Sequence, residues 1–148
     1  MDNIFNTSFE MSLRVLLLLS SDNGTAKTAD MIALADTITI YSGAFDLSGD
    51  NLHGDIDFVL DKFDARRELI KQALKDLTLR GLINIAQYDD GFRYTINEIG
   101  LNFCGSLTSD YANEYRILSL AAHQLIGTKN EREVFAMINA TAKRFLGR

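Results

Sequence analysis

The spacing of apolar positions changes twice between residues 61 and 100, from a helical period to an alternating one and back. Four apolar residues first recur at helical spacing, which predicts an amphipathic helix with one buried face. These residues are Ile70, Ala73, Leu74 and Leu77. Gly81 follows as a C-terminal helix cap, because glycine accepts the left-handed backbone conformation that ends many helices.

A β-hairpin is predicted directly after this helix. Residues 82–88 and 92–96 are rich in apolar, β-branched and aromatic side chains and flank an Asp-Asp-Gly turn at residues 89–91, a pattern typical of hairpins. Thr95 and Glu98 have capping-box spacing, so a new helix is expected as the second strand ends. The order of helix, glycine, hairpin and helix is typical of a winged helix-turn-helix, with the hairpin as its wing.

The rest of the chain is predicted to be helical. A first helix is expected over residues 11–19 behind a capping box of Thr7 and Glu10, and further helices over 28–41, 98–107 and 111–126. A last helix is expected to start at a capping box of Thr128 and Glu131. The predicted fold class is therefore mainly α with a small β-hairpin. We expect a single winged-helix domain over residues 1–148, with a helical extension at 109–148.

An acidic insertion at residues 43–62 separates the second and third predicted helices. Its apolar content is too high for a free linker, so we expect it to be packed and able to bind a partner. It contains Asp50, His53, Asp55 and Asp57, which are possible metal ligands. They lack the alternating oxygen ligands and closing glutamate of a calcium loop, so turn-forming hydrogen bonds explain them better.

Composition argues against secretion and membrane insertion, and the absence of known motifs argues against catalysis. The chain has 148 residues, of which 47% are hydrophobic and 24% charged, as in a soluble globular protein. Its only cysteine, Cys104, is expected to be a buried apolar side chain, and a reducing cytoplasm is the simplest compartment. The apolar run 15–19 is too short to span a bilayer. Known phosphate-loop, nucleophile and metal motifs are absent, so no catalytic, cofactor-binding or metal-binding residues are predicted.

Two groups of basic residues bear on the kind of partner that the chain binds. Lys71 and Lys75 on the third helix and Arg93 on the wing are the candidate DNA contacts, but the formal net charge is −5 and carboxylates share both surfaces. Arg66 and Arg67 are expected either to pair with an aspartate of the insertion or to meet a partner's carboxylate.

Six segments, taken in order, carry a resemblance to a known family. They are residues 3–7, 51–55, 66–69, 81–83, 92–100 and 111–115. In order and spacing they resemble the small middle components of bacterial ABC-three-component systems, which include Lamassu-type anti-phage and anti-plasmid operons. The resemblance implies a non-enzymatic adaptor between an SMC-like or Rad50-like ABC ATPase and an effector, often a nuclease, with DNA contact only inside the complex.

For such a subunit we expect a protein interface formed by two neighbouring groups of residues. They are Asn51, Leu52, His53, Gly54, Arg66 and Arg67. The alternative is that the same residues only brace the insertion against the third helix. The alternative function for the whole chain is a dimeric winged-helix transcriptional regulator that uses Lys71, Lys75 and Arg93 to bind an operator.

Overall fold

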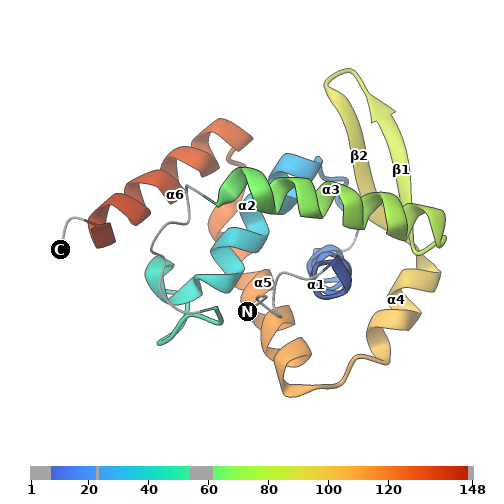
Figure 1. The fold of residues 1–148 in the computed structure, drawn as a ribbon, viewed down its shortest axis with the longest axis horizontal. Coiled ribbons are helices and arrows are strands. Elements are labelled where there is room, and N and C mark those ends of the chain that lie inside the picture. The colour runs from blue at the N-terminus through green and yellow to red at the C-terminus, as the bar shows by residue number, and fades with distance from the viewer. Residues whose placement is uncertain (1–7, 23, 54–61, 147–148) are drawn as a thin grey trace.

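The computed structural model describes residues 8–22, 24–53 and 62–146, and these residues are mainly helical (Figure 1). The described part contains α1 (Ser8–Ser21), α2 (Ala29–Ile40), α3 (Phe63–Leu79), α4 (Glu98–Gly105), α5 (Asp110–Ile126) and α6 (Glu131–Leu146). A short 3-10 helix, η2 (Ser42–Phe45), follows α2, and the strands β1 (Ile83–Tyr88) and β2 (Gly91–Ile96) form an antiparallel hairpin. The predicted combination of helices with one hairpin is confirmed.

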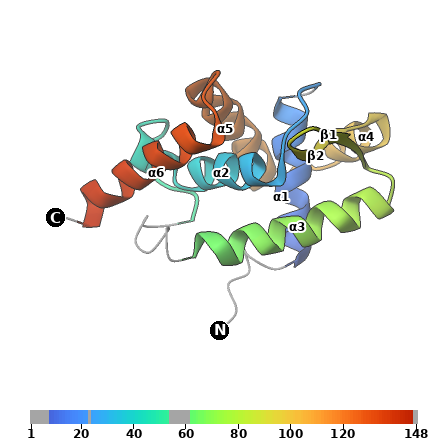
Figure 2. The same ribbon diagram turned by 90° about the horizontal axis from the view of Figure 1, so that it is seen from above.

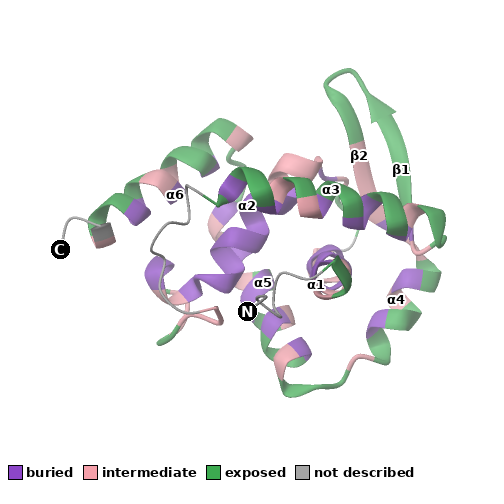
Figure 3. Cartoon of the chain, in the orientation of Figure 1, coloured by how far each residue is buried: buried purple, intermediate pink, exposed green. Residues whose placement is uncertain are grey.

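The core lies where α1 and α2 pack against α3 and α5. In Figure 1, α1 is seen end-on, with α3 passing beside it and α5 on its other side. Helix α2 is buried from Ile32 to its end at Ile40, because neighbouring helices cover it on several sides (Figure 3). Residues 37–40 are all β-branched and by themselves favour a strand, but this burial holds them in the helix. The hydroxyls of Thr37 and Thr39 donate to the carbonyl oxygens of Ala33 and Ala35 within the helix.

The end of α3 and the start of α2 follow the sequence prediction. The backbone N–H of Leu82 donates to the Leu77 carbonyl and that of Gly81 to the Thr78 carbonyl, both at 3.0 Å. This is a Schellman motif, and Gly81 takes the required positive φ of 77°. The Thr28 hydroxyl accepts from the Met31 N–H at 3.1 Å and caps α2.

Two predicted capping boxes are wrong by two residues each. Thr95 is still paired with Asn84 inside the hairpin, so the side chain of Asn97, which accepts from the Gly100 N–H, caps α4 instead. At α6 the reciprocal bonds join Asn130 and Glu133 rather than Thr128 and Glu131. In both cases the chain needs two more residues to leave the preceding turn or strand. Thr7, the expected first cap, lies outside the described residues.

The hairpin register differs slightly from the Asp-Gly turn that the sequence indicates. Tyr88 pairs with Gly91, so Asp89 and Asp90 are the turn residues, and Gly91 supplies the positive φ of 121° at the start of β2. Only the base of the hairpin is buried, at Ile83 and Ile96. The segment before α2 adds a bridge to β2, with two backbone hydrogen bonds between Lys27 and Tyr94.

Both C-terminal helices pack on this core. Tyr115 of α5 is completely buried between α1 and α2. Helix α6 lies against α2 and η2 (Figure 2). Its buried apolar residues are Val134, Ile138 and Ala142. The Phe135 ring also meets Phe63 of α3 edge-on, with 5.8 Å between ring centroids.

We predict that Gly100→Ala destabilises the protein. A Cβ at this position would lie 2.2 Å from the Leu82 carbonyl oxygen and 2.7 Å from the Ile96 side chain, so α4 would have to move off the hairpin base. A loss of about 1–3 kcal/mol in the free energy of unfolding is expected from overpacking, measured by urea denaturation. The matched control is Gly105→Ala in the same helix, which meets nothing within 4 Å and should be neutral or stabilising. Equal effects of the two changes would contradict the packing argument.

Candidate functional site

A buried carboxylate, Asp36 of α2, gathers polar groups from three other helices. The Arg14 guanidinium of α1 donates to both of its oxygens, from Nε at 3.0 Å and from Nη2 in a shorter contact. The Tyr115 hydroxyl of α5 donates to Asp36 Oδ1 at 2.7 Å. Arg66 Nε of α3 lies 4.0 Å from Oδ2. All four side chains are buried, so one carboxylate joins α1, α2, α3 and α5. We call these four residues the Asp36 cluster.

Two arginines face a single aspartate in this cluster, and the second arginine is satisfied partly by neutral groups. Arg66 donates to the hydroxyls of Thr37 at 3.3 Å and Tyr41 at 3.4 Å, and its guanidinium carbon lies 5.6 Å from the centroid of the Tyr41 ring. This cation–π contact lowers the cost of burying the charge. The cluster is therefore a fixed, positively charged element of the core.

A second polar layer lies between the Asp36 cluster and the insertion. The His53 Nε2 and the Tyr111 hydroxyl are 2.7 Å apart, and the Tyr111 hydroxyl is also hydrogen-bonded to Glu10. Burial, followed by the positive charge of Arg14, lowers the pKa of His53 to about 4. His53 is therefore neutral at pH 7 in the folded protein.

The Asp36 carboxyl keeps its charge although it is completely buried. Burial alone would raise its pKa, but the charge and hydrogen bonds of Arg14, the charge of Arg66 and the Tyr115 hydroxyl together lower it. Burial of the phenol, followed by the charge of the same carboxylate, raises the pKa of Tyr115 well above its ordinary value. The cluster therefore offers no group that exchanges protons near pH 7, and its geometry fits a structural role better than acid–base chemistry.

The described part of the insertion is packed, as the sequence predicts. The Asn51 side-chain oxygen accepts from the Ala44 N–H at 3.1 Å, and the His53 N–H donates to the Ile40 carbonyl at 3.2 Å. Asn51, Leu52 and His53 are each half-buried. These contacts brace the segment against α2 and η2. Gly54 and the rest of the insertion up to residue 61 lie outside the described residues.

The structure separates the two arginines of the predicted interface. Arg66 lies in the core with Asp36, whereas Arg67 is one-third exposed and lies 3.9 Å from Asp30 and 3.3 Å from Asp64. Within the described residues, both arginines therefore pair with aspartates of α2 and α3 rather than of the insertion. Of the two arginines only Arg67 reaches the surface, at the N-terminal end of α2 beside Asp30, whereas residues 51–53 contact the other end of α2. The interface role of the group stays a prediction.

The three candidate DNA contacts are at the surface of two different elements. Lys71 and Lys75 are exposed on α3, and Lys71 lies 3.6 Å from Glu68. Arg93 of β2 donates to Asp90 at 2.9 Å and its guanidinium lies 4.5 Å from the centroid of the Tyr88 ring. Two of the three charges are thus compensated by neighbouring carboxylates.

Sequence reasoning did not find the Asp36 cluster, although a signal for it exists. Arg14 and Asp36 are the only charged residues in two mainly apolar helical runs, at 11–19 and 32–40. A charge in such a position must be paired when the helix is buried, and the two charges have opposite sign. What the pattern cannot give is the third and fourth partner, because Tyr115 and Arg66 come from distant helices.

Neither a metal site nor a membrane span is found in the described part of the chain. No group of three or more histidine, cysteine or acidic side chains is placed to hold a metal ion there, and Asp55 and Asp57 lie outside that part. None of its helices is both long and apolar enough to cross a bilayer. Cys104 is buried, as predicted, and burial raises the pKa of its thiol.

These features define a mainly helical protein with a buried ionic core and a braced insertion. The family model described as ABC-three component (ABC-3C) system Middle Component 2 matches residues 4–148, and the chain belongs to this family. The family's description names a component of a multi-protein system and no catalytic activity. Comparison with curated proteins gave no match, and comparison with solved structures gave none either.

We predict that Arg14→Met strongly destabilises the protein. The change leaves the Asp36 carboxylate buried with only a distant arginine and one hydroxyl. Removing one partner of a buried ion pair costs about 3–5 kcal/mol, which should appear as a lower urea midpoint or loss of folding. Lys75→Met on the exposed face of α3 is the control and should change stability by less than about 0.5 kcal/mol. A small effect of Arg14→Met would show that the pair is dispensable.

We also predict that stability falls as the pH drops from about 6.5 to about 4. Burial is the main cause that lowers the pKa of both His53 and His123 from 6.5 to about 4. Between these pH values the two histidines therefore bind protons in the unfolded chain but stay neutral in the folded chain, which favours unfolding. Urea midpoints at pH 7, 6 and 5 should decrease in that order. The His53→Gln and His123→Gln variants should each show a shallower decrease, and an unchanged slope in the double variant would refute the assignment.

Proposed function

We propose that this chain is a non-enzymatic adaptor that couples an SMC-like or Rad50-like ABC ATPase to an effector in a bacterial defence complex. The observation that carries the proposal is the family match over residues 4–148, since the family is a middle component of a three-component system. A Lamassu-type anti-phage or anti-plasmid operon, a nuclease effector and a cytoplasmic location are the finer parts of this proposal.

A winged-helix architecture is the second part of the proposal. It is supported by the order of α2, α3 and the hairpin, by the Schellman motif that leads from α3 directly into β1, and by the bridge of Lys27 to Tyr94. The acidic hairpin tip and the paired Lys71 and Arg93 favour a protein partner over DNA for this module.

The adaptor surface that we propose is the start of the insertion together with Arg67. Residues 51–53 and Arg67 are partly exposed, and the His53–Tyr111 contact connects this surface to α5. Arg66, being buried, would position the surface rather than touch a partner.

The proposed mechanism is a restraint on the effector. The adaptor would dock near the ATPase heads and hold the effector inactive until DNA engagement changes the geometry of the heads. Such coupling requires that the adaptor bind the two states of the ATPase with different affinity. A rigid core suits this role, because a displacement at one surface then moves the other surface with it instead of being lost in local rearrangement.

Co-expression with the products of neighbouring genes tests the proposal. We expect the tagged chain to co-elute with a large ATPase and an effector in size-exclusion chromatography, with a defined mass. Arg67→Glu should abolish the complex while leaving the melting temperature unchanged. Arg80→Glu, which reverses an exposed arginine at the end of the same helix, is the matched control and should keep it.

Two outcomes would contradict the adaptor. A chain that stays free of both proteins has no coupling role. A free dimer that retains DNA, with binding lost in Lys71→Glu or Arg93→Glu, would identify the transcriptional regulator instead. Loss of folding in Arg67→Glu would show that the residue braces α3 against α2 rather than forming an interface.

A further inference from the structure

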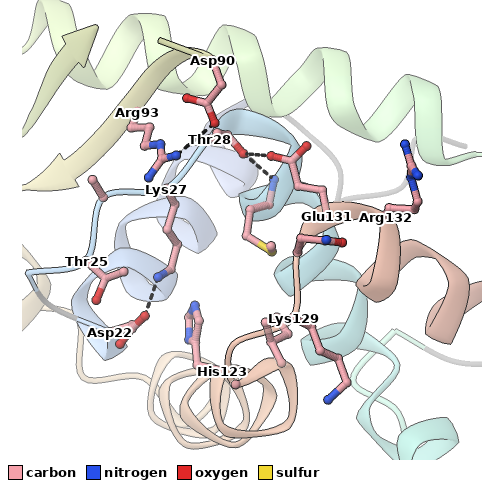
Figure 4. A pocket seen from close by; sticks show the side chains of 15 residues that line it. Asp22, Thr25, Lys27, Thr28, Asp90, Arg93, His123, Lys129, Glu131 and Arg132 are labelled. Atoms are coloured by element: carbon pink, nitrogen blue, oxygen red, sulfur yellow. Dashed lines mark hydrogen bonds and ion pairs between the residues drawn. The ribbon is translucent and has the colours of Figure 1, made fainter. Parts of the chain in front are cut away.

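The hairpin has one closed edge and one open edge. The edge of β2 is closed, because the segment before α2 pairs with it through two backbone hydrogen bonds between Lys27 and Tyr94. Figure 4 shows this closed side, where Arg93 of β2 lines the same cleft as Lys27 and Thr28 and is paired with Asp90 of the hairpin turn. Strand β1 is the outer strand in Figure 1, and within the described residues only β2 pairs with it.

The backbone groups of two β1 residues point out of this open edge. Tyr94 uses both its N–H and its carbonyl for Lys27, so these groups face away from Ile85, its partner across the hairpin. Opposed residues of an antiparallel pair direct their backbone groups either toward each other or away from each other, and the two kinds alternate along the strand. The N–H and carbonyl of Ile85 and, two residues further on, of Gln87 therefore point outward. In the part of the chain that is described, these groups have no backbone partner.

The residues of β1 do not block the addition of another strand. Natural proteins usually protect an open edge with charged residues, proline, a bulge or a covering segment. The strand Ile83–Tyr88 contains neither a charged residue nor proline, its register with β2 is continuous, and it is exposed from residue 84 to residue 88. Ile85 shares one face of the hairpin with Tyr94 and with Phe92, which is 54% exposed. An apolar face therefore adjoins the free backbone groups.

We propose that β1 pairs with β1 of a second copy of this chain, antiparallel about a two-fold axis at Ala86. This axis places Ile85 of each copy opposite Gln87 of the other, so the outward backbone groups meet, and it places Asn84 opposite Tyr88. It also keeps the apolar faces of both hairpins on the same side of one continuous sheet. Ala86 lies opposite its own copy, where the side chains of an antiparallel pair come closest, and its small size permits this contact.

Charge complementarity favours a second copy as the occupant. In the antiparallel arrangement the acidic tip of each hairpin lies beside the foot of the other hairpin, where α3 ends. Asp90 of the tip is paired with Arg93, whereas the exposed Asp89 has no cation within 4.0 Å among the described residues. Arg80, the exposed C-terminal cap of α3, has no carboxylate within this distance in the same part of the chain. The two-fold axis brings these opposite charges together twice.

This edge is separate from the proposed adaptor surface. The hairpin follows the C-terminal end of α3, whereas Arg67 lies near the N-terminal end of that helix, beside Asp30. A dimer formed through β1 therefore leaves Arg67 and residues 51–53 of both copies free. Contacts with an ATPase and an effector do not depend on it.

Sedimentation equilibrium of the full-length chain over a range of concentrations tests the proposal. We expect an equilibrium between monomer and dimer. Ala86→Glu should abolish the dimer, because two carboxylates would meet across the axis, whereas within one copy the new glutamate lies opposite Arg93 and leaves the hairpin intact. Gln87→Pro should also abolish it, since proline removes an outward N–H that the hairpin does not use.

The matched control for Ala86→Glu is Ala136→Glu, which adds the same charge at an exposed alanine of α6 and should leave the dimer unchanged. A charge exchange tests the contact of tip and foot. Asp89→Arg should weaken the dimer by about tenfold, because two attractions become two repulsions, and adding Arg80→Asp should restore most of the affinity. Circular dichroism and the melting temperature of each variant establish that it is folded.

Three results would overturn the pairing of β1 with its own copy. A chain that stays monomeric up to about 1 mM has no such interface. A dimer that persists in both Ala86→Glu and Gln87→Pro uses another surface. If the amides of Ile85 and Gln87 are protected from hydrogen exchange only in the co-expressed complex, a strand of another protein occupies the edge. Arg80→Glu should still co-elute with the ATPase and the effector although its own dimer is weaker, so this inference and the adaptor proposal fail independently.

Discussion

The burial of the Asp36 carboxylate is the constraint on which the rest of the structure depends. An ionised carboxylate without water costs several kcal/mol, which is recovered only with good geometry and hydrogen bonds to both oxygens. Arg14 and Tyr115 supply these bonds and Arg66 adds charge. The relative placement of α1, α2, α3 and α5 is therefore tied to a single functional group. Apolar packing alone would permit several arrangements of four amphipathic helices, whereas a directional cluster selects one.

Helix α2 is held at both of its ends as well as in its middle. At its C-terminal end, the Ile40 carbonyl accepts from the His53 N–H of the insertion; at its N-terminal end, the Thr28 hydroxyl donates to Glu131 of α6. Between these ends α2 is buried and held by Asp36. The start of the insertion, the ionic core and α6 are therefore all held by the same helix.

The sequence predicts elements well and tertiary partners poorly. The bounds of α2 and the hairpin, the glycine stop at Gly81 and the packed start of the insertion follow from local rules, because spacing, capping and turn chemistry act over a few residues. The capping boxes at Thr95 and Thr128 fail because a side chain two residues later is better placed for the free backbone groups. The sequence predicts that Arg66 pairs with an aspartate of the insertion or with a partner's carboxylate, whereas its proximity to Asp36 depends on packing between helices that no local pattern encodes.

The place of Tyr115 in the core has a consequence for how the chain can be divided. Helix α5 follows the hairpin in the sequence, where an added C-terminal extension would be expected. Nevertheless the hydroxyl of its Tyr115 donates to Asp36, and its apolar face covers α1 and α2. A chain shortened before residue 110 would keep every element up to α4 but would open its ionic centre to water. The N-terminal part is therefore not a transferable module, and gene fusions or natural rearrangements in this family should have break points outside α1 to α5.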